Sequence, residues 1–65
     1  MDWRKLEYEM KSRGVTVGEL CSELGMSRSA FYRKCRGISE FTLGEVQRIV
    51  EFLDLGTPMG IFFAE

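Results

Sequence analysis

The chain has 65 residues, which is enough for one domain and too few for a second. Hydrophobic residues make up 45% of it and charged residues 29%, a balance that argues against disorder and favours an ordinary globular domain. No run approaches the roughly 18 apolar residues that a membrane span needs, and the first residues lack the basic-then-apolar layout of a secretion signal. We therefore expect one cytoplasmic domain over residues 1–65, with no membrane association.

The net charge of −1 hides an uneven distribution. Residues 27–36 contain four of the nine cations and none of the ten acids, so this segment carries +4 and the other 55 residues carry −5. In the last 28 residues, five acids accompany a single cation, Arg48. Because local charge decides which surface attracts nucleic acid, residues 27–36 are a candidate binding segment despite the acidic total.

A first helix is predicted from residue 2 to residue 13. Asp2 is a suitable N-cap, and Gly14 is the expected left-handed residue after the helix end. Lys5 and Glu9 are four residues apart and are expected to pair on the exposed side. The apolar residues at helical spacing on the other side are Trp3, Leu6 and Met10.

Residues 16–37 contain the start and stop signals of two short helices. Thr16-Val17-Gly18-Glu19 is a capping box, in which the side chains of its first and last residues each accept a backbone N–H of the other. Ser27 is a suitable N-cap for the second helix, and Gly25 between the helices can become left-handed at little cost. We expect two helices held at an angle by a tight turn, which is a helix-turn-helix.

The two cysteines, Cys21 and Cys35, fall on the predicted inner faces of these two helices. Buried free cysteines behave as small hydrophobic residues, which is the interpretation we favour, and the alternative is one disulfide between them. Since the chain has no histidine and only these two thiols, no zinc site and no cofactor are expected.

Two more helices are predicted after a short loop. Thr42-Leu43-Gly44-Glu45 is a second capping box, and it opens a helix that runs to about Leu53 with a strongly apolar stripe. Gly56 is expected to close this element. Thr57 and Pro58 are then the N-cap and first residue of a short last helix that reaches residue 63. With no strand pattern, the prediction is an all-α fold of five helices.

A longer motif runs from Thr16 to Gly37 as T-x-x-E-L-C-x-x-L-G-M-S-R-S-x-F-x-R-x-x-x-G and continues from Val46 to Leu53 as V-x-x-I-V-x-x-L. It resembles the lambda-repressor-like, Cro-type helix-turn-helix family (XRE family) of phage repressors and bacterial regulators. It departs from that family at Val17, where a polar residue is common, and at Lys34, where a hydrophobic one is frequent. The resemblance implies a compact five-helix domain and a sequence-specific transcriptional regulator, similar to a small phage or prophage repressor or Cro protein.

The second helix of the motif, residues 28–36, has two different sides. Phe31 and Cys35 are four residues apart and are expected to face the core. The resemblance implies that the opposite side lies in the major groove of DNA. An arginine there can donate hydrogen bonds to both O6 and N7 of a guanine, so guanines are expected in each half-site. The residues expected to contact bases are Arg28, Ser29, Tyr32 and Arg33, with Tyr32 touching a thymine methyl group or a phosphate.

Contacts to the DNA backbone are expected around this helix. Backbone amides at helix starts bind phosphate, and cations beside the groove add positive charge. The residues expected to contact phosphates are Thr16, Ser27, Lys34, Arg36, Gly37, Ser39 and Thr42.

The C-terminal part carries four large apolar residues, Phe52, Ile61, Phe62 and Phe63. Related domains dimerise through this end, so the resemblance implies a homodimer interface there and a pseudo-palindromic operator. The alternative is that Ile61 and one phenylalanine fill the core, because two adjacent helical residues cannot both point inward.

The alternatives to DNA binding are a protein-interaction role and an enzymatic one. A helix-turn-helix can serve as a protein-interaction adaptor or an antitoxin, with the acidic C-terminal half as the surface for the partner protein. An enzyme is not expected, because the sequence has no histidine, no evident pair of catalytic carboxylates and no glycine-rich phosphate loop. The expected partner is therefore double-stranded DNA, bound by a homodimer.

Overall fold

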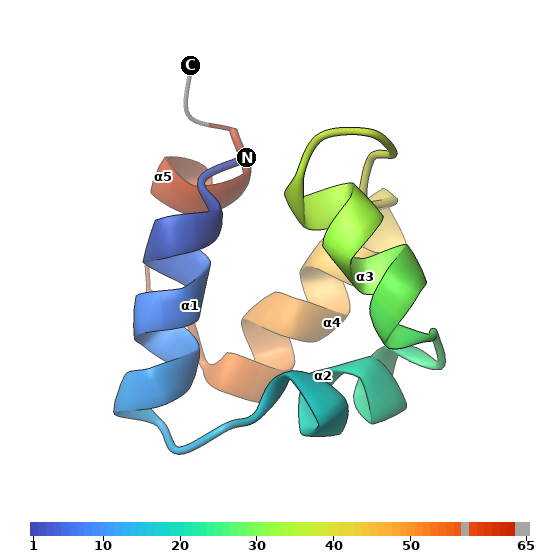
Figure 1. The fold of residues 1–65 in the computed structure, drawn as a ribbon. Helices are drawn as coiled ribbons and strands as arrows, with labels where there is room; N and C mark the ends of the chain where they lie inside the picture. The colour runs from blue at the N-terminus through green and yellow to red at the C-terminus, as the bar shows by residue number, and fades with distance from the viewer. Residues whose placement is uncertain (57, 64–65) are drawn as a thin grey trace.

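The computed structural model describes residues 1–56 and 58–63, and over these ranges it contains helices and no strand (Figure 1). The elements are α1 (Trp3–Ser12), α2 (Val17–Leu24), α3 (Arg28–Cys35), α4 (Leu43–Leu53) and α5 (Met59–Phe62). The all-α prediction is confirmed for this part of the chain. The Cα radius of gyration of 10.6 Å is close to the value of about 11 Å expected for a compact chain of this length. None of the described helices has the length and apolar character to cross a membrane.

The predicted helix starts are confirmed at four of the five helices. The side chains of Asp2, Thr16, Ser27 and Thr42 each accept a hydrogen bond from the backbone N–H three residues later, at 3.1–3.3 Å. Both capping boxes are complete, because the carboxylates of Glu19 and Glu45 accept the backbone N–H of their N-caps at 3.0 and 2.9 Å. The predicted N-cap Thr57 lies outside the described residues, and α5 begins at Met59, directly after Pro58.

The left-handed residues that follow the helices agree with the prediction at three glycines and differ from it after α4. Gly14, Gly25 and Gly37 have φ of 68°, 68° and 82°, the left-handed conformation expected after a helix. The predicted end of α4 at about Leu53 is confirmed, but Gly56 as its closing residue is wrong: the left-handed residue that follows the helix is Asp54, with φ of 53°. Asp54 can take this conformation because a short polar side chain tolerates it better than most others.

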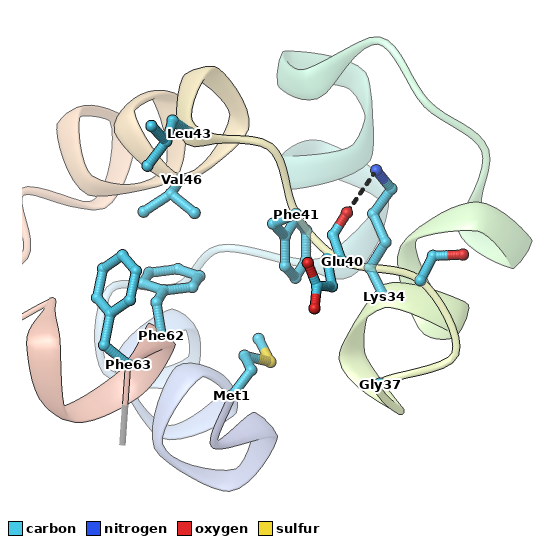
Figure 2. A pocket seen from close by; sticks show the side chains of 10 residues that line it. Met1, Lys34, Gly37, Glu40, Phe41, Leu43, Val46, Phe62 and Phe63 are labelled. Carbon is cyan, nitrogen blue, oxygen red and sulfur yellow. Dashed lines mark hydrogen bonds between the residues drawn. The ribbon is translucent and has the colours of Figure 1, made fainter. Parts of the chain in front are cut away.

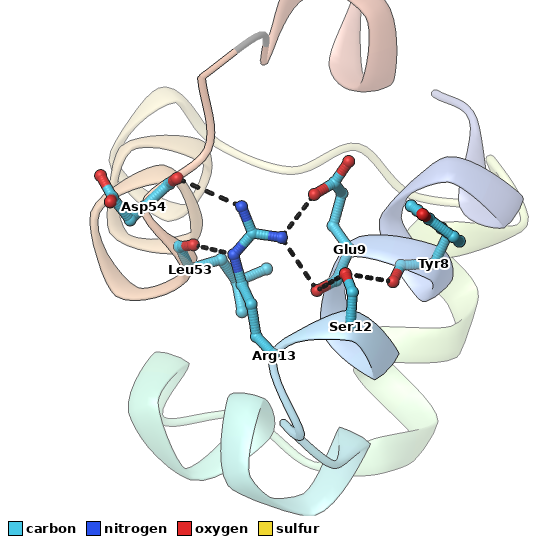
Figure 3. A network of polar contacts seen from close by, with 6 residues as sticks. All are labelled: Tyr8, Glu9, Ser12, Arg13, Leu53 and Asp54. Atoms are coloured by element: carbon cyan, nitrogen blue, oxygen red, sulfur yellow. Dashed lines mark hydrogen bonds and ion pairs between the residues drawn. The ribbon is translucent and has the colours of Figure 1, made fainter.

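Arg13 holds the end of α4 against α1 (Figure 3). Its guanidinium donates to the carbonyl oxygens of Leu53 and Asp54, and it forms an ion pair with Glu9. The predicted pairing of Glu9 with Lys5 is therefore wrong, and the Lys5 ammonium instead donates to the Gly60 carbonyl at 3.5 Å. A cation at the C-terminus of α4 also complements the negative end of that helix dipole.

One core cluster receives side chains from all five helices. Phe31 of α3 is fully buried, with the rings of Trp3 and Phe41 packed edge-on against it at centroid distances of 5.7 and 5.8 Å. Cys21 and Cys35 are buried and free, which confirms the prediction of reduced core thiols. The buried members of the cluster are Leu6, Met10, Leu20, Cys21, Phe31, Cys35, Ile49, Leu53, Leu55 and Ile61.

Candidate nucleic-acid interface

The α3 helix separates the buried residues from the predicted base-reading residues. Successive residues of an α-helix are rotated by about 100°, so residues 28, 29, 32, 33 and 36 lie within one sector of about 140°. Phe31 and Cys35 lie outside this sector and are buried. The residues in the sector are all exposed, and they are Arg28, Ser29, Tyr32, Arg33 and Arg36. We call this set the α3 face.

The side chains of the three arginines of the α3 face make no ion pair or hydrogen bond with any described residue. By contrast, Arg13, Lys34 and Arg48 each pair with a carboxylate, of Glu9, Glu45 and Glu23. An unpaired guanidinium keeps all its N–H donors available for an external acceptor. The α3 face therefore offers three guanidinium groups whose N–H donors can bind phosphate oxygens or the O6 and N7 acceptors of guanine.

Lys34 belongs to a different surface from the arginines beside it. Its ammonium lies 2.8 Å from a carboxylate oxygen of Glu45 and 3.4 Å from the Glu40 carbonyl oxygen, and it sits 5.8 Å from the Phe41 ring centroid. The Lys34 side chain is only 17% exposed. This geometry disagrees with the expected phosphate contact, because the charge of Lys34 is already used to join α3 to α4.

Tyr32 is positioned on the α3 face by a residue of α1. Its ring packs edge-on against Trp3 and Phe31, at centroid distances of 6.1 and 5.9 Å, and it remains 38% exposed. From the sequence, Trp3 is expected only in the core, because helical spacing does not identify neighbours on another helix. The structure thus brings the start of α1 to the border of the α3 face.

Arg28 lies across the start of α2. The guanidinium occupies the space beside Gly18 that a side chain would fill, with Nη2 at 2.7 Å from the position of an added Cβ. Gly18 was not among the expected site residues. The available signal was a glycine inside a short predicted helix, where it lowers helix stability relative to alanine.

The residues expected to contact phosphate at the helix starts, Thr16, Ser27 and Thr42, are exposed, and part of their hydrogen-bonding capacity is used in capping. Their hydroxyls accept the capping hydrogen bonds, and the backbone N–H groups of Thr16 and Thr42 donate to glutamates. The amides that an α-helix leaves free belong to the residues directly after the caps. The first helical residues therefore offer free amides to a phosphate at these helix starts, and the hydroxyls of Ser27 and Thr42, which only accept in the capping bonds, can still donate to one.

The amides of the loop after α3 are also used internally. The backbone N–H of Gly37 donates to the Lys34 carbonyl at 3.2 Å, and that of Ser39 donates to the Arg33 carbonyl at 3.3 Å. These bonds give hydrogen-bond partners to carbonyl groups in the last turn of α3. Both residues are exposed, so the Ser39 hydroxyl and the neighbouring Arg36 remain as the polar groups available to a phosphate on this side.

A pocket of about 330 Å³ lies between the loop after α3, the start of α4 and α5 (Figure 2). The rings of Phe41 and Phe62 pack edge-on, with their centroids 6.0 Å apart. The side chains of Leu43 and Phe63, which also line the pocket, are 78% and 51% exposed. The lining residues are Met1, Lys34, Gly37, Ser39, Glu40, Phe41, Leu43, Val46, Phe62 and Phe63.

The four predicted dimer residues divide between core and surface. Ile61 is 4% exposed and belongs to the core, so its assignment to an interface is wrong and the core alternative holds for it. Phe62 is partly buried against the core, whereas Phe52 and Phe63 are exposed. A second chain could therefore reach Phe52 and Phe63 without unfolding any helix.

Comparison of the chain with protein-family models, curated proteins and solved structures found no match. The functional inference consequently depends on the chemistry of the α3 face and on the way α2 and α3 are joined.

Proposed function

We propose that this chain is a helix-turn-helix protein that binds double-stranded DNA sequence-specifically and regulates transcription. In this proposal α2, the left-handed turn at Gly25 and α3 form the motif, and α3 enters the major groove. The observation that carries the proposal is the set of three arginines on the exposed side of α3 that have no partner among the described residues. Their charge is concentrated on a molecule that is otherwise acidic, which directs DNA to this one helix.

The residues of the α3 face take different roles in this complex. Arg28 and Arg33 donate to guanine O6 and N7, and Ser29 contacts a base edge between them. Tyr32, whose ring is supported by Trp3, contacts a thymine methyl group or a phosphate. Arg36 lies at the end of α3 and binds the phosphate backbone, which fixes position rather than sequence.

We further propose that the chain acts as a homodimer on a pseudo-palindromic operator. Phe52 and Phe63 are exposed aromatic side chains, and such groups are favoured at the centre of protein interfaces. A two-fold dimer would place two α3 helices about 34 Å apart, one turn of DNA. Sedimentation that finds a monomer at high micromolar concentration, both free and on DNA, contradicts this part of the proposal.

The decisive experiment selects bound sequences from a random duplex pool and then measures affinity for the selected duplex at several salt concentrations. Phosphate contacts release counterions, so log Kd should rise linearly with log salt, with a slope of about 0.9 per phosphate contacted. A regulator should also prefer the selected duplex at least about a thousandfold over random DNA. Absence of duplex binding, or binding that salt does not weaken, would refute DNA recognition.

A protein-interaction adaptor, or an antitoxin that also binds a toxin, is the second candidate. It is favoured by the pocket beside α4 and α5, where Leu43 and Phe63 are exposed at the rim. An adaptor predicts that Arg33→Ala leaves function intact, whereas Leu43→Asp and Phe63→Asp abolish it. If α3 recognises DNA, Arg33→Ala should instead impair function.

A further inference from the structure

Gly18 is a glycine whose backbone does not need one. Gly14, Gly25 and Gly37 have positive φ and end helices or begin turns, but Gly18 lies inside α2 with ordinary helical backbone. Glycine at such a position weakens a helix relative to alanine, and α2 has only eight residues. Since the backbone gives no reason for glycine here, the space beside Gly18 is the next feature to consider.

That space is filled by the guanidinium of Arg28. An added Cβ at Gly18 would lie 2.7 Å from Nη2, 3.6 Å from Cζ and 3.7 Å from Nε of Arg28. Real Cβ atoms essentially never come as close as 2.7 Å, so a side chain at Gly18 would move the Arg28 guanidinium, which as the end of a flexible side chain can shift without disturbing the fold. Gly44 has the same place in α4, second after a capping-box threonine, yet its nearest neighbour would be Thr42 Oγ1 at 3.9 Å. The close approach is thus specific to Gly18.

We propose that Gly18 is a positioning residue that fixes the direction of the Arg28 guanidinium and thereby the base that Arg28 selects. This inference rests on the proposed recognition of DNA by α3. The Arg28 side chain has no hydrogen bond or ion pair with the described residues, and its guanidinium lies over Gly18; in this proposal that packing restrains the guanidinium before DNA binds. A side chain that is already ordered loses less freedom on binding and discriminates more sharply between neighbouring bases.

The experiment compares the base preference of the chain and of four variants at every position of the selected duplex. Arg28→Ala should reduce the preference at one base pair by between about fivefold and a hundredfold. Gly18→Ala should reduce the preference at the same base pair by at least about threefold, while Gly44→Ala retains it. The double variant Gly18→Ala with Arg28→Ala should be no worse at that base pair than Arg28→Ala alone, because both act through one guanidinium.

A second measurement tests the contact without DNA. The Nε proton of Arg28 should show a nuclear Overhauser effect to the Gly18 Hα protons, and Gly18→Ala should remove the contact while thermal melting confirms that the variant folds. An unchanged base preference in Gly18→Ala, or absence of the Overhauser effect in the original chain, overturns the positioning role and leaves DNA recognition standing. Failure of the original chain to bind any duplex instead overturns DNA recognition and the inference that depends on it.

Discussion

The guanidinium of Arg13, just after α1, donates a hydrogen bond to the carbonyl oxygen of Leu53 at the end of α4. It also reaches the Asp54 carbonyl oxygen at 3.3 Å and forms an ion pair with Glu9 (Figure 3). One side chain thereby satisfies carbonyl groups that the end of α4 leaves without intrahelical partners. It ties α1 to α4, two helices that are separated in the sequence by residues 13–42.

We predict that Arg13→Ala destabilises the fold by about 1.5–3 kcal/mol, the usual range for hydrogen bonds that involve a charged group. Urea unfolding followed by circular dichroism measures the change. Lys11→Ala is the matched control, because Lys11 is an exposed cation in the last turn of α1 and should change stability by less than about 0.5 kcal/mol. Equal effects of the two substitutions would show that Arg13 acts only through its charge.

Asp54 and Gly25 share a left-handed backbone and should respond in opposite directions to substitution. We predict that Asp54→Gly stabilises the protein by about 0.5–1 kcal/mol, because it relieves the penalty of a side chain at positive φ. Gly25→Ala should destabilise it by about 1–2 kcal/mol, although nothing lies within 4 Å of the added Cβ. Thermal melts of both variants provide the measurement. Stabilisation by Gly25→Ala would contradict the conformational explanation.

The features that could be predicted from sequence are those set by neighbouring residues. The capping boxes at Thr16 and Thr42 and the left-handed Gly25 depend on contacts within three or four residues, and all three are confirmed. The left-handed residue after α4 could not be predicted in the same way. Asp54 is held by Arg13, which lies 41 residues earlier, and no local pattern connects the two.

In the candidate site, too, contacts between neighbouring residues could be predicted and contacts between different helices could not. Helical spacing alone places Phe31 inside and Arg33 outside, since it needs only the rotation per residue. Spacing does not reveal that Lys34 pairs with Glu45 of α4. The same limit applies to Arg28, whose neighbour Gly18 is a residue of another helix.

The two capping glutamates should make stability depend on pH in the acidic range. Hydrogen bonds from Thr16 lower the pKa of Glu19 below 4.5. For Glu45, partial burial acts to raise the pKa, but the hydrogen bonds from Lys34 and Thr42 and the Lys34 charge outweigh it and lower the pKa. A pKa that is lower in the folded protein stabilises it above the unfolded value of 4.5, and this contribution is lost as the pH falls through the folded pKa.

We therefore predict that Glu45→Gln destabilises the protein at pH 7 but leaves its stability nearly unchanged at pH 3. Glutamine keeps the shape and the oxygen acceptor of a capping box, so the substitution removes mainly the charge. Urea unfolding at pH 3, 5 and 7 measures the difference between the two proteins. A difference that stays constant over this range would show that the Glu45 charge adds nothing to stability.

The cysteines should be unreactive as long as the protein is folded. Burial, followed by the nearby Cys21, raises the pKa of the Cys35 thiol to about 12. Burial also raises the pKa of Cys21, partly offset by the Arg28 charge. Since the thiolate is the reactive form, we predict that iodoacetamide at pH 8 labels either thiol only through the small unfolded fraction of the protein. Labelling that is fast in buffer and insensitive to stabilising solutes would contradict this.

Three neighbouring cations of α3 should affect DNA binding in three different ways. Arg33→Ala should reduce affinity for the selected duplex by about 1–3 kcal/mol and relax the preference at one base pair. Arg36→Ala should weaken binding to all sequences alike and reduce the salt slope by about one. Lys34→Ala should leave the salt slope unchanged and instead lower stability, because it breaks the ion pair with Glu45.

Fluorescence anisotropy over a series of salt concentrations, on both selected and random duplex, separates these outcomes. The three variants each remove one positive charge, so a response to total charge alone would make their salt slopes equal. Such equality would contradict the division of α3 into a DNA-facing side and a side that faces α4. A larger loss of slope for Lys34→Ala than for Arg36→Ala would place DNA on the α4 side instead. Urea unfolding of the same variants shows whether a lower affinity reflects lost contacts or a lower fraction of folded protein.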